Sequence, residues 1–191
     1  MKIYLARHGE TDWNAERRLQ GWTDIPLNEN GRDQARQLTL RMQSIQLDAV
    51  YCSILRRSRE TAEMLKRTPT IALRELNEQS LGKYEGEQLD GDQMREFQMR
   101  RKDFDDALDG GESRNQHRAR IRSALEQIQR NHSAESQVMV VGHGGTNSLI
   151  LRELFDLQTD LMFSIGNSDL FLIDLPSRGT PTLWKFLTME K

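Results

Sequence analysis

The chain has 191 residues, which suits one domain (1–191) built around a single hydrophobic core. Apolar residues make up 36% and charged residues 29%, a globular composition, and the net charge of −2 excludes the strongly basic balance of many nucleic-acid-binding or membrane-surface proteins. A single cysteine, Cys52, excludes an internal disulfide framework. The N-terminus lacks a signal-peptide core, and no apolar run approaches the ~20 residues that span a bilayer, so we expect a cytoplasmic protein without nucleic-acid or membrane partners.

Short apolar runs alternate with helical patterns through the first part of the chain. The runs at 3–6 and 49–52 predict buried strands. Asn28 is suited to cap a helix after Pro26. The apolar side of that helix consists of Ala35, Leu38, Met42 and Ile45. A charged helix then runs to near Leu65, and residues 70–76 are β-rich.

The second part continues the same alternation. A helix is predicted from near Glu112, then a strand at 138–141, a helix at 146–155, and strands at 170–174 and 183–187. The apolar face of the first of these helices consists of Ile121, Ala124, Leu125 and Ile128. This order predicts a three-layer α/β/α fold with a mainly parallel sheet, in which ligands bind beyond the carboxyl ends of the strands.

Two predicted loops carry a histidine at such a strand end. His8 follows the first strand within Arg7-His8-Gly9, and His143 follows the strand at 138–141 within Gly142-His143-Gly144. The chain has only four histidines, so two in the same setting favour a shared site over two unrelated loop residues. A neutral imidazole can attack phosphorus, and an adjacent cation such as Arg7 lowers its pKa toward that state. These features favour phosphoryl transfer.

A longer string makes this hypothesis specific. The sequence LARHGETDWN at 5–14 resembles the signature of the histidine phosphatase superfamily, the phosphoglycerate-mutase-like family. The similarity continues through ERRLQGW at 16–22, PLN at 26–28 and Gly31, and looks like the broad-specificity phosphatase and α-ribazole phosphatase branch. Further matches follow in the family's order: LRRSRETA at 55–62, LNEQSLGKYEG at 76–86, GGES at 110–113 and VVGHGG at 140–145. The resemblance is weakest in a variable segment at 87–109, expected near the mouth of the site.

The resemblance assigns roles to particular residues. It implies that His8 is the nucleophile and is phosphorylated, and that Glu78 protonates the leaving group and later activates water. The phosphoryl oxygens are then expected to contact Arg7, Arg57, His143, Asn14, Gln20 and the backbone N–H of Gly144. No cofactor and no metal are expected, and the implied substrate is a small phosphorylated metabolite.

Each assignment has a simpler interpretation. Arg57 stands between other arginines, a pattern typical of a solvated helix face, and Glu75 is the second candidate for the acid. His117 and His132 are predicted to lie at the surface, and Trp13 and Trp22 to pack rather than bind ligand. In the variable segment, the apolar side chains face either the substrate or the core, and the basic ones form a solvated face or meet an acidic substrate. These side chains are Met94, Phe97, Met99, Phe104, Arg95, Arg100, Arg101 and Lys102.

Other phosphate chemistries do not fit the sequence. A tyrosine-phosphatase loop, C-x5-R, starting at Cys52 has Ser58 in place of its arginine. Neither a G-x-x-x-x-G-K-[ST] loop nor a G-x-G-x-x-G fingerprint occurs, and no metal-ligand spacing is present. Two alternatives stay open: a phosphoglycerate mutase primed by 2,3-bisphosphoglycerate, and a non-catalytic phospholigand-binding regulatory protein. The substrate and the oligomeric state cannot be deduced from the sequence.

Overall fold

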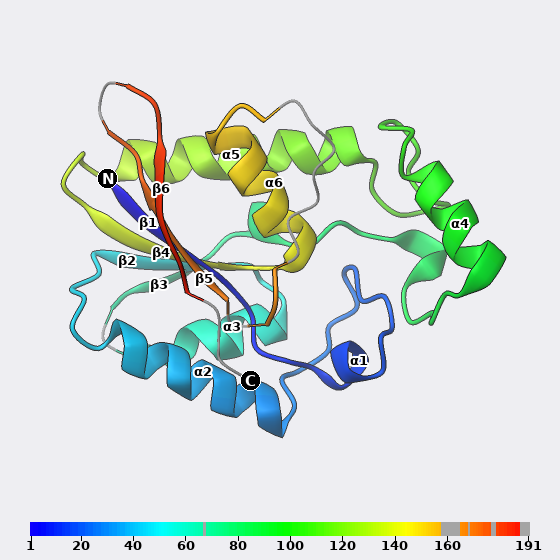
Figure 1. Cartoon of the computed structure of the whole chain (residues 1–191), viewed down its shortest axis with the longest axis horizontal. Coiled ribbons are helices and arrows are strands. Elements are labelled where there is room, and N and C mark those ends of the chain that lie inside the picture. Colours follow the sequence, from blue (N-terminus) through cyan, green and yellow to red (C-terminus); the bar gives the residue numbers. More distant parts are fainter. Residues whose placement is uncertain (67, 158–164, 168, 177–178, 188–191) are drawn as a thin grey trace.

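The computed structural model describes residues 1–66, 68–157, 165–167, 169–176 and 179–187. Strands and helices alternate along the chain, as the sequence predicts (Figure 1). In chain order the elements are β1 (Lys2–Arg7), α1 (Asp12–Ala15), α2 (Glu29–Met42), β2 (Ala49–Cys52), α3 (Arg56–Glu63), β3 (Thr70–Ala72), the 3₁₀ helices η1 (Arg74–Leu76) and η2 (Gly82–Tyr84), α4 (Gly91–Arg100), α5 (Arg114–Asn131), β4 (Gln137–Gly142), α6 (Gly144–Leu154), β5 (Leu170–Asp174) and β6 (Thr182–Leu187).

The strands form one sheet in the order β3-β2-β4-β1-β5-β6. β1 pairs with β4 in parallel, β2 pairs in parallel with both β3 and β4, and β5 and β6 complete the sheet in antiparallel fashion. The predicted mainly parallel sheet is therefore confirmed. In the β1–β4 register Arg7 lies opposite Gly142, so the loops that carry His8 and His143 leave the sheet side by side.

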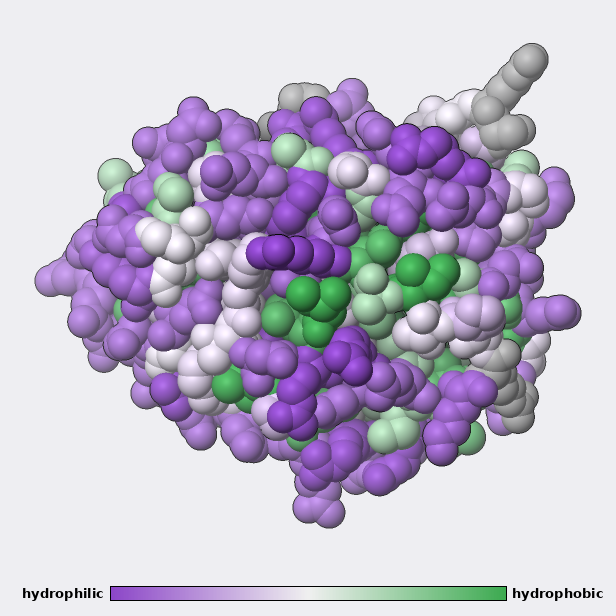
Figure 2. Space-filling model, turned by 180° about the vertical axis from the view of Figure 1, so that it is seen from behind, coloured by the Kyte–Doolittle hydropathy of each residue, from purple (hydrophilic) through white to green (hydrophobic). Residues whose placement is uncertain are grey.

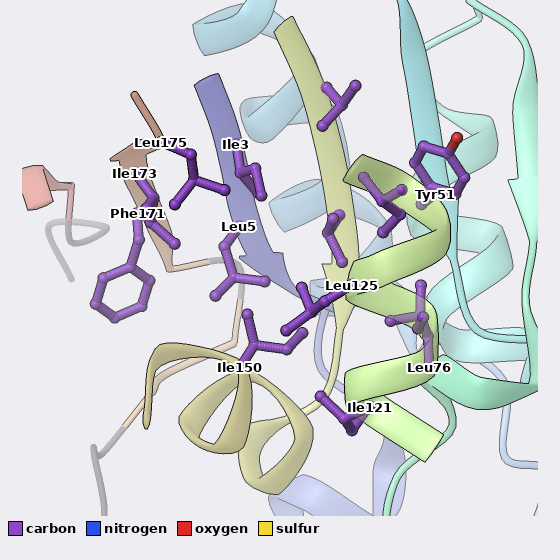
Figure 3. Close-up of a cluster of buried hydrophobic side chains, with 14 of the residues drawn as sticks. Ile3, Leu5, Tyr51, Leu76, Ile121, Leu125, Ile150, Phe171, Ile173 and Leu175 are labelled. Atoms are coloured by element: carbon purple, nitrogen blue, oxygen red, sulfur yellow. The ribbon is translucent and has the colours of Figure 1, made fainter. Parts of the chain in front are cut away.

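Helices cover both faces of this sheet, and the alternation of side chains along the strands explains why. Ile3 and Leu5 of β1 point toward α5 and α6, where they enter a large apolar cluster (Figure 3). Tyr4 and Ala6 point to the opposite face and pack in a second cluster that includes Leu38 of α2. Both strand faces are buried, which is why the strands read as continuous apolar runs.

A smaller third cluster lies outside the sheet. Leu81, Tyr84, Phe97 and Leu108 pack together, which places α4 beside the 3₁₀ helix η2. Figure 1 shows α4 at the same end of the molecule as α1. The face seen in Figure 2 is largely hydrophilic, with apolar side chains gathered near its centre. Among the helices of the described ranges, none combines the length and apolar character needed to cross a membrane.

Some predicted boundaries differ from the observed ones. The β-rich segment at 70–76 is a strand only over Thr70–Ala72, because the turn of η1 buries both Leu73 and Leu76, spaced three residues apart. Ile45 lies beyond the end of α2 but still packs, half-buried, against the second cluster. Asn28 caps α2 as predicted, its side chain accepting from the Gly31 N–H at 2.8 Å.

Candidate active site

A cavity of 210 Å³ opens at the carboxyl edge of the sheet. Six of the predicted site residues line it: Arg7, His8, Asn14, Gln20, Arg57 and Glu78. His143 is buried beside His8, with 5.1 Å between the two ring centroids. Residues that are distant in the sequence therefore meet at the place where the parallel-sheet rule directs a ligand.

His8 follows β1 and is only 2% exposed. Its Nδ1 lies 2.6 Å from the carbonyl oxygen of Gly9. Because a carbonyl only accepts, Nδ1 carries the hydrogen, and in the neutral ring Nε2 keeps its lone pair. Burial holds the pKa of His8 well below its ordinary value, and the charges of Arg57 and Arg7 lower it further. His8 therefore presents an unprotonated nitrogen at neutral pH.

The glycine next to His8 is required by close packing. A Cβ at Gly9 would lie 2.3 Å from the carbonyl oxygen of Gly31, at the start of α2. The Gly9 N–H donates to the hydroxyl of Thr61 on α3 at 3.1 Å. The loop that carries His8 is thus held between two helices on the same face of the sheet.

His143 follows β4 and depends on a serine at the end of β2. Its Nε2 lies 2.8 Å from Ser53 Oγ, and that oxygen also accepts from the Leu55 N–H at 3.2 Å. With the ring hydrogen on Nδ1, the serine hydroxyl donates to Nε2. Among the described residues Nδ1 has no partner, although it is buried. In this tautomer His143 has a hydrogen on Nδ1 to donate to an oxyanion.

Arg57 on α3 is 1% exposed, and its terminal nitrogens donate to the carbonyls of Thr23 at 2.9 Å and Gly21 at 2.8 Å. Arg7 donates to the Ile165 carbonyl at 2.5 Å. Burial lowers the pKa of Arg7, and lowers the pKa of Arg57 to about 10. The Nε of each arginine is buried without a partner among the described residues. Desolvated guanidinium groups of this kind favour a bound anion.

Glu78 lies after η1, with its carboxylate at the N-terminus of α6. Oε2 accepts from the Gly145 N–H at 2.8 Å, and Oε1 accepts from the N–H groups of Thr146 at 3.0 Å and Gln79 at 2.9 Å. Glu75, the second candidate for the acid, does not line the cavity. Of the two candidate acids, the fold brings Glu78 to the cavity.

The backbone that carries Glu78 is fixed by a clamp. Arg120 on α5 donates to the carbonyls of Glu75 and Asn77, each at 2.6 Å, and to that of Glu78 at 2.7 Å. Trp22 Nε1 also donates to the Glu78 carbonyl, at 2.5 Å. Trp22 therefore contacts the backbone of Glu78 and does not line the cavity.

The three remaining predicted phosphate contacts are placed differently with respect to the cavity. Asn14 Oδ1 accepts from the Thr11 N–H at 3.2 Å and from Asn167 Nδ2 at 3.2 Å, leaving the amide nitrogen as the donor for the cavity. Gln20 lines the cavity, and its Oε1 is buried without a partner among the described residues. Gly144 begins α6 but does not line the cavity.

Several contributing residues were not anticipated from the sequence. Ser53 follows β2 at the same sheet edge as His8 and His143, so the strand-end rule offered a signal for it. Arg120 carried none, because its partners are backbone carbonyls far away in sequence. Among the variable-segment residues whose role the sequence left open, Arg101 and Phe97 line the cavity, whereas Met99 is 63% exposed.

Of the two histidines predicted to lie at the surface, His117 is buried, which makes that prediction wrong, and His132 is half-buried. His117 is 4% exposed, and its Nε2 lies 3.1 Å from Thr146 Oγ1, because the face of α5 that bears it packs against α6. His132 is half-buried, with Nε2 at 2.9 Å from the hydroxyl of Tyr51. Polar neighbours in the sequence concealed both tertiary contacts.

Other chemistries find little support at this site. Burial raises the pKa of the Cys52 thiol to about 12, so the thiolate needed for a cysteine nucleophile is disfavoured. In the part of the chain that the structure describes, no group of three or more His, Cys, Asp or Glu side chains is placed to hold a metal ion.

Comparison with known proteins places this geometry in a family. Residues 3–183 match the model of the histidine phosphatase superfamily, branch 1. A relative from Photorhabdus laumondii, named "Probable phosphoglycerate mutase GpmB", is 36% identical over 75% of this chain and 70% of its own. Phosphoglycerate mutase-like protein 4 of Arabidopsis thaliana is 34% identical over 81% of this chain and 70% of its own.

Solved structures agree with the family match. The α-ribazole phosphatase of Shigella flexneri has a TM-score of 0.84 and 25% identity, covering 100% of both chains. Bacillus stearothermophilus YhfR has a TM-score of 0.80 and 30% identity, covering 95% of this chain and 94% of its own. The chain belongs to the histidine phosphatase superfamily, branch 1, whose members are phosphatases or mutases.

Proposed function

We propose that this protein is a metal-independent phosphomonoesterase that acts on small phosphorylated metabolites through a phosphohistidine at His8. One observation carries the proposal. The hydrogen bond from His8 Nδ1 to the Gly9 carbonyl leaves Nε2 unprotonated in a cavity that also holds Arg7 and Arg57. A neutral nitrogen nucleophile beside two guanidinium groups suits attack on a phosphate ester, because the cations offset the negative charge of the ester.

The proposed reaction has two steps. His8 Nε2 attacks phosphorus, the bond from phosphorus to the ester oxygen breaks, and protonated Glu78 gives its proton to the departing alkoxide. Water then attacks the phosphohistidine, Glu78 takes the water proton, and the phosphorus–nitrogen bond breaks to release inorganic phosphate. Arg7, Arg57 and the Nδ1–H of His143 stabilise the oxygens as charge shifts.

A mutase is the second candidate, and the names of the two curated relatives favour it. A mutase uses the same phosphohistidine but passes the phosphoryl group to another hydroxyl instead of water. The resemblance implies a longer insertion at this place in the mutase branch, whereas the variable segment at 87–109 has 23 residues, which favours hydrolysis. A non-catalytic role is disfavoured because the nucleophile, both arginines and the acid occupy one cavity.

Phosphate release from a panel of phosphomonoesters in EDTA tests the proposal. The wild type is expected to release phosphate, and His8→Ala to lose at least about 1,000-fold in kcat/KM, since the covalent route then lacks its nucleophile. His132→Ala is the matched control, because it removes a histidine outside the cavity.

The outcomes separate the candidates. An acid-labile phosphoryl label on the wild type but not on His8→Ala supports the intermediate. Isomerisation of 3-phosphoglycerate that needs the bisphosphate primer, without phosphate release, favours the mutase. Activity of His8→Ala within tenfold of wild type, or activity lost in EDTA and restored by Mg²⁺, would contradict the proposed mechanism.

A further inference from the structure

A second cavity, of 360 Å³, adjoins the one that contains His8. Gln79, Arg101 and Gly145 line both cavities, so these residues form the boundary between them. The second cavity extends from that boundary along α5 and α6, which contribute Arg118 and Arg152. A ligand in the second cavity therefore lies next to the catalytic one.

Positive charge is concentrated around this second cavity. Four arginines line it: Arg101, Arg114, Arg118 and Arg152. Among the described lining residues the single carboxylate is Glu153, which pairs with Arg118 and also with Arg122 outside the cavity. The whole chain carries a net charge of −2, so this excess of cations is local. Guanidinium groups match carboxylate and phosphate oxygens in geometry as well as in charge.

Two of these arginines are set by the surrounding protein: Arg114 is held by contacts, and the Nε of Arg101 is buried. Arg114 donates to the Arg101 carbonyl at 3.0 Å, and its guanidinium carbon lies 4.1 Å from the ring centroid of Phe104. Arg101 has a buried Nε without a partner among the described residues, and burial lowers the pKa of Arg101. A bound anion would offset the cost of burying this charge.

The cavity is also connected to the proposed acid. His117 lines the cavity, and its Nε2 lies 3.1 Å from Thr146 Oγ1. The same hydroxyl oxygen lies 3.2 Å from Glu78 Oε1. A ligand that shifts His117 or the start of α6 therefore acts on the group that transfers the proton.

We propose that this arginine cavity is a second anion-binding site that accepts a carboxylate or phosphate group. Such a group has two possible sources: the far end of the phosphomonoester whose phosphoryl group lies against His8, or a separate small anion. The consequence for turnover rests on the proposed phosphatase activity, whereas the binding of the anion does not.

Calorimetric titration with methylphosphonate tests binding without any turnover. The wild type is expected to bind two equivalents, one in each cavity. Arg118→Gln combined with Arg152→Gln should weaken one of the two sites about tenfold or more, because charge-assisted hydrogen bonds are lost. Arg122→Gln is the matched control: it removes an ion pair to the same Glu153 but not a residue of the cavity lining.

A ladder of substrates identifies the source of the anion. Alkanol monophosphates of increasing chain length are compared with the same molecules ending in a carboxylate. If the anion is the far end of the substrate, kcat/KM for the carboxylate-terminated phosphate should exceed kcat/KM for the alkyl phosphate of the same length about tenfold at one chain length. The double variant should remove this preference, and Arg122→Gln should retain it. If the anion is separate, methylphosphonate should change kcat for the alkyl phosphates in the wild type, whereas in the double variant it should act only as a competitive inhibitor at the His8 cavity.

The two measurements keep this proposal distinct from the proposed function. A single phosphonate site in the wild type, or two sites that the double variant leaves unchanged, would overturn the second site whatever the turnover. Two sites in a protein that hydrolyses no ester would retain the second site and reject the phosphatase.

Discussion

Each of the two buried histidines at the proposed site has one ring nitrogen bonded to a protein oxygen. The Gly9 carbonyl accepts from His8 Nδ1, and the Ser53 hydroxyl lies 2.8 Å from His143 Nε2. The first contact leaves a lone pair on His8 Nε2, and the second leaves His143 Nδ1 without a partner among the described residues. In the proposed mechanism the two imidazoles therefore have different roles, nucleophile and hydrogen-bond donor.

Removing the serine tests this assignment. Ser53→Ala should lower kcat about 10- to 100-fold, because the His143 ring loses the bond that fixes its orientation and its tautomer. In a His143→Ala background the same change should have almost no further effect on kcat, since the two residues act as a unit. Full additivity of the two losses would show that Ser53 acts elsewhere. Steady-state kinetics of the double-mutant cycle measures this.

The position of the acid is tested by a pair of glutamates. Glu78→Gln should lower kcat at least about 100-fold, because proton transfer to the leaving group is lost, and should change phosphate affinity little. Glu75→Gln, three residues away, should leave kcat within about threefold of wild type. The reverse ranking would assign the acid to Glu75. Initial rates together with inhibition by phosphate separate turnover from affinity.

Among the elements, α6 links the proposed acid to the sheet. Its first residues follow His143 at the end of β4, and its free N–H groups hold the Glu78 carboxylate. These donors and the helix dipole stabilise the carboxylate that forms once Glu78 has given its proton to the leaving group. The helix that covers one face of the sheet therefore also positions a side chain from a distant loop.

Gly145→Ala should separate activity from stability. A Cβ at Gly145 would lie 2.7 Å from Glu78 Oε1, so the carboxylate must move, which its flexible side chain permits. Turnover should fall about tenfold or more, whereas the free energy of unfolding should change by less than about 1 kcal/mol, because alanine favours a helix more than glycine does. Gly144→Ala places its Cβ 3.5 Å from the Arg7 guanidinium carbon, an ordinary contact, and should cost less activity. Urea denaturation measures the free energy of unfolding, and steady-state rates on the same samples measure the loss of turnover.

At the scale of the whole molecule, His8, His117 and His143 are each at most 4% exposed. Burial is the largest cause holding the pKa of each well below its ordinary value. In the unfolded chain a histidine takes up its proton near pH ~6.5, whereas these three stay neutral to lower pH. Acid therefore favours unfolding.

The expected dependence of stability on pH follows. Above about pH 6.5 the three histidines contribute no slope; below it, the free energy of unfolding should fall by about 1.4 kcal/mol per pH unit for each histidine until its lower native pKa is reached. His117→Gln retains a donor for Thr146 and should reduce the slope by one such increment. Urea denaturation between pH 5 and pH 8 measures the effect, and an unchanged slope in His117→Gln would contradict it.

The sequence by itself determined the alternating order of elements and the strand ends that carry His8 and His143. It did so because apolar periodicity and glycine positions are local features of the sequence, which can be recognised without knowledge of tertiary contacts. The family-like segments at 55–62 and 76–86 also placed Arg57 and Glu78, although their own surroundings resemble those of exposed charged residues.

Only the tertiary structure decided which polar groups meet. Ser53 against His143, Arg120 against the backbone of the Glu78 loop, and His117 beneath α6 all join segments distant in the chain. Polar side chains have no periodicity that reports their partners, and a buried histidine and an exposed one look alike in sequence. The arginine cavity also depends on tertiary structure. Packing of α5 against α6 brings together arginines whose sequence neighbours resemble those of solvent-exposed residues.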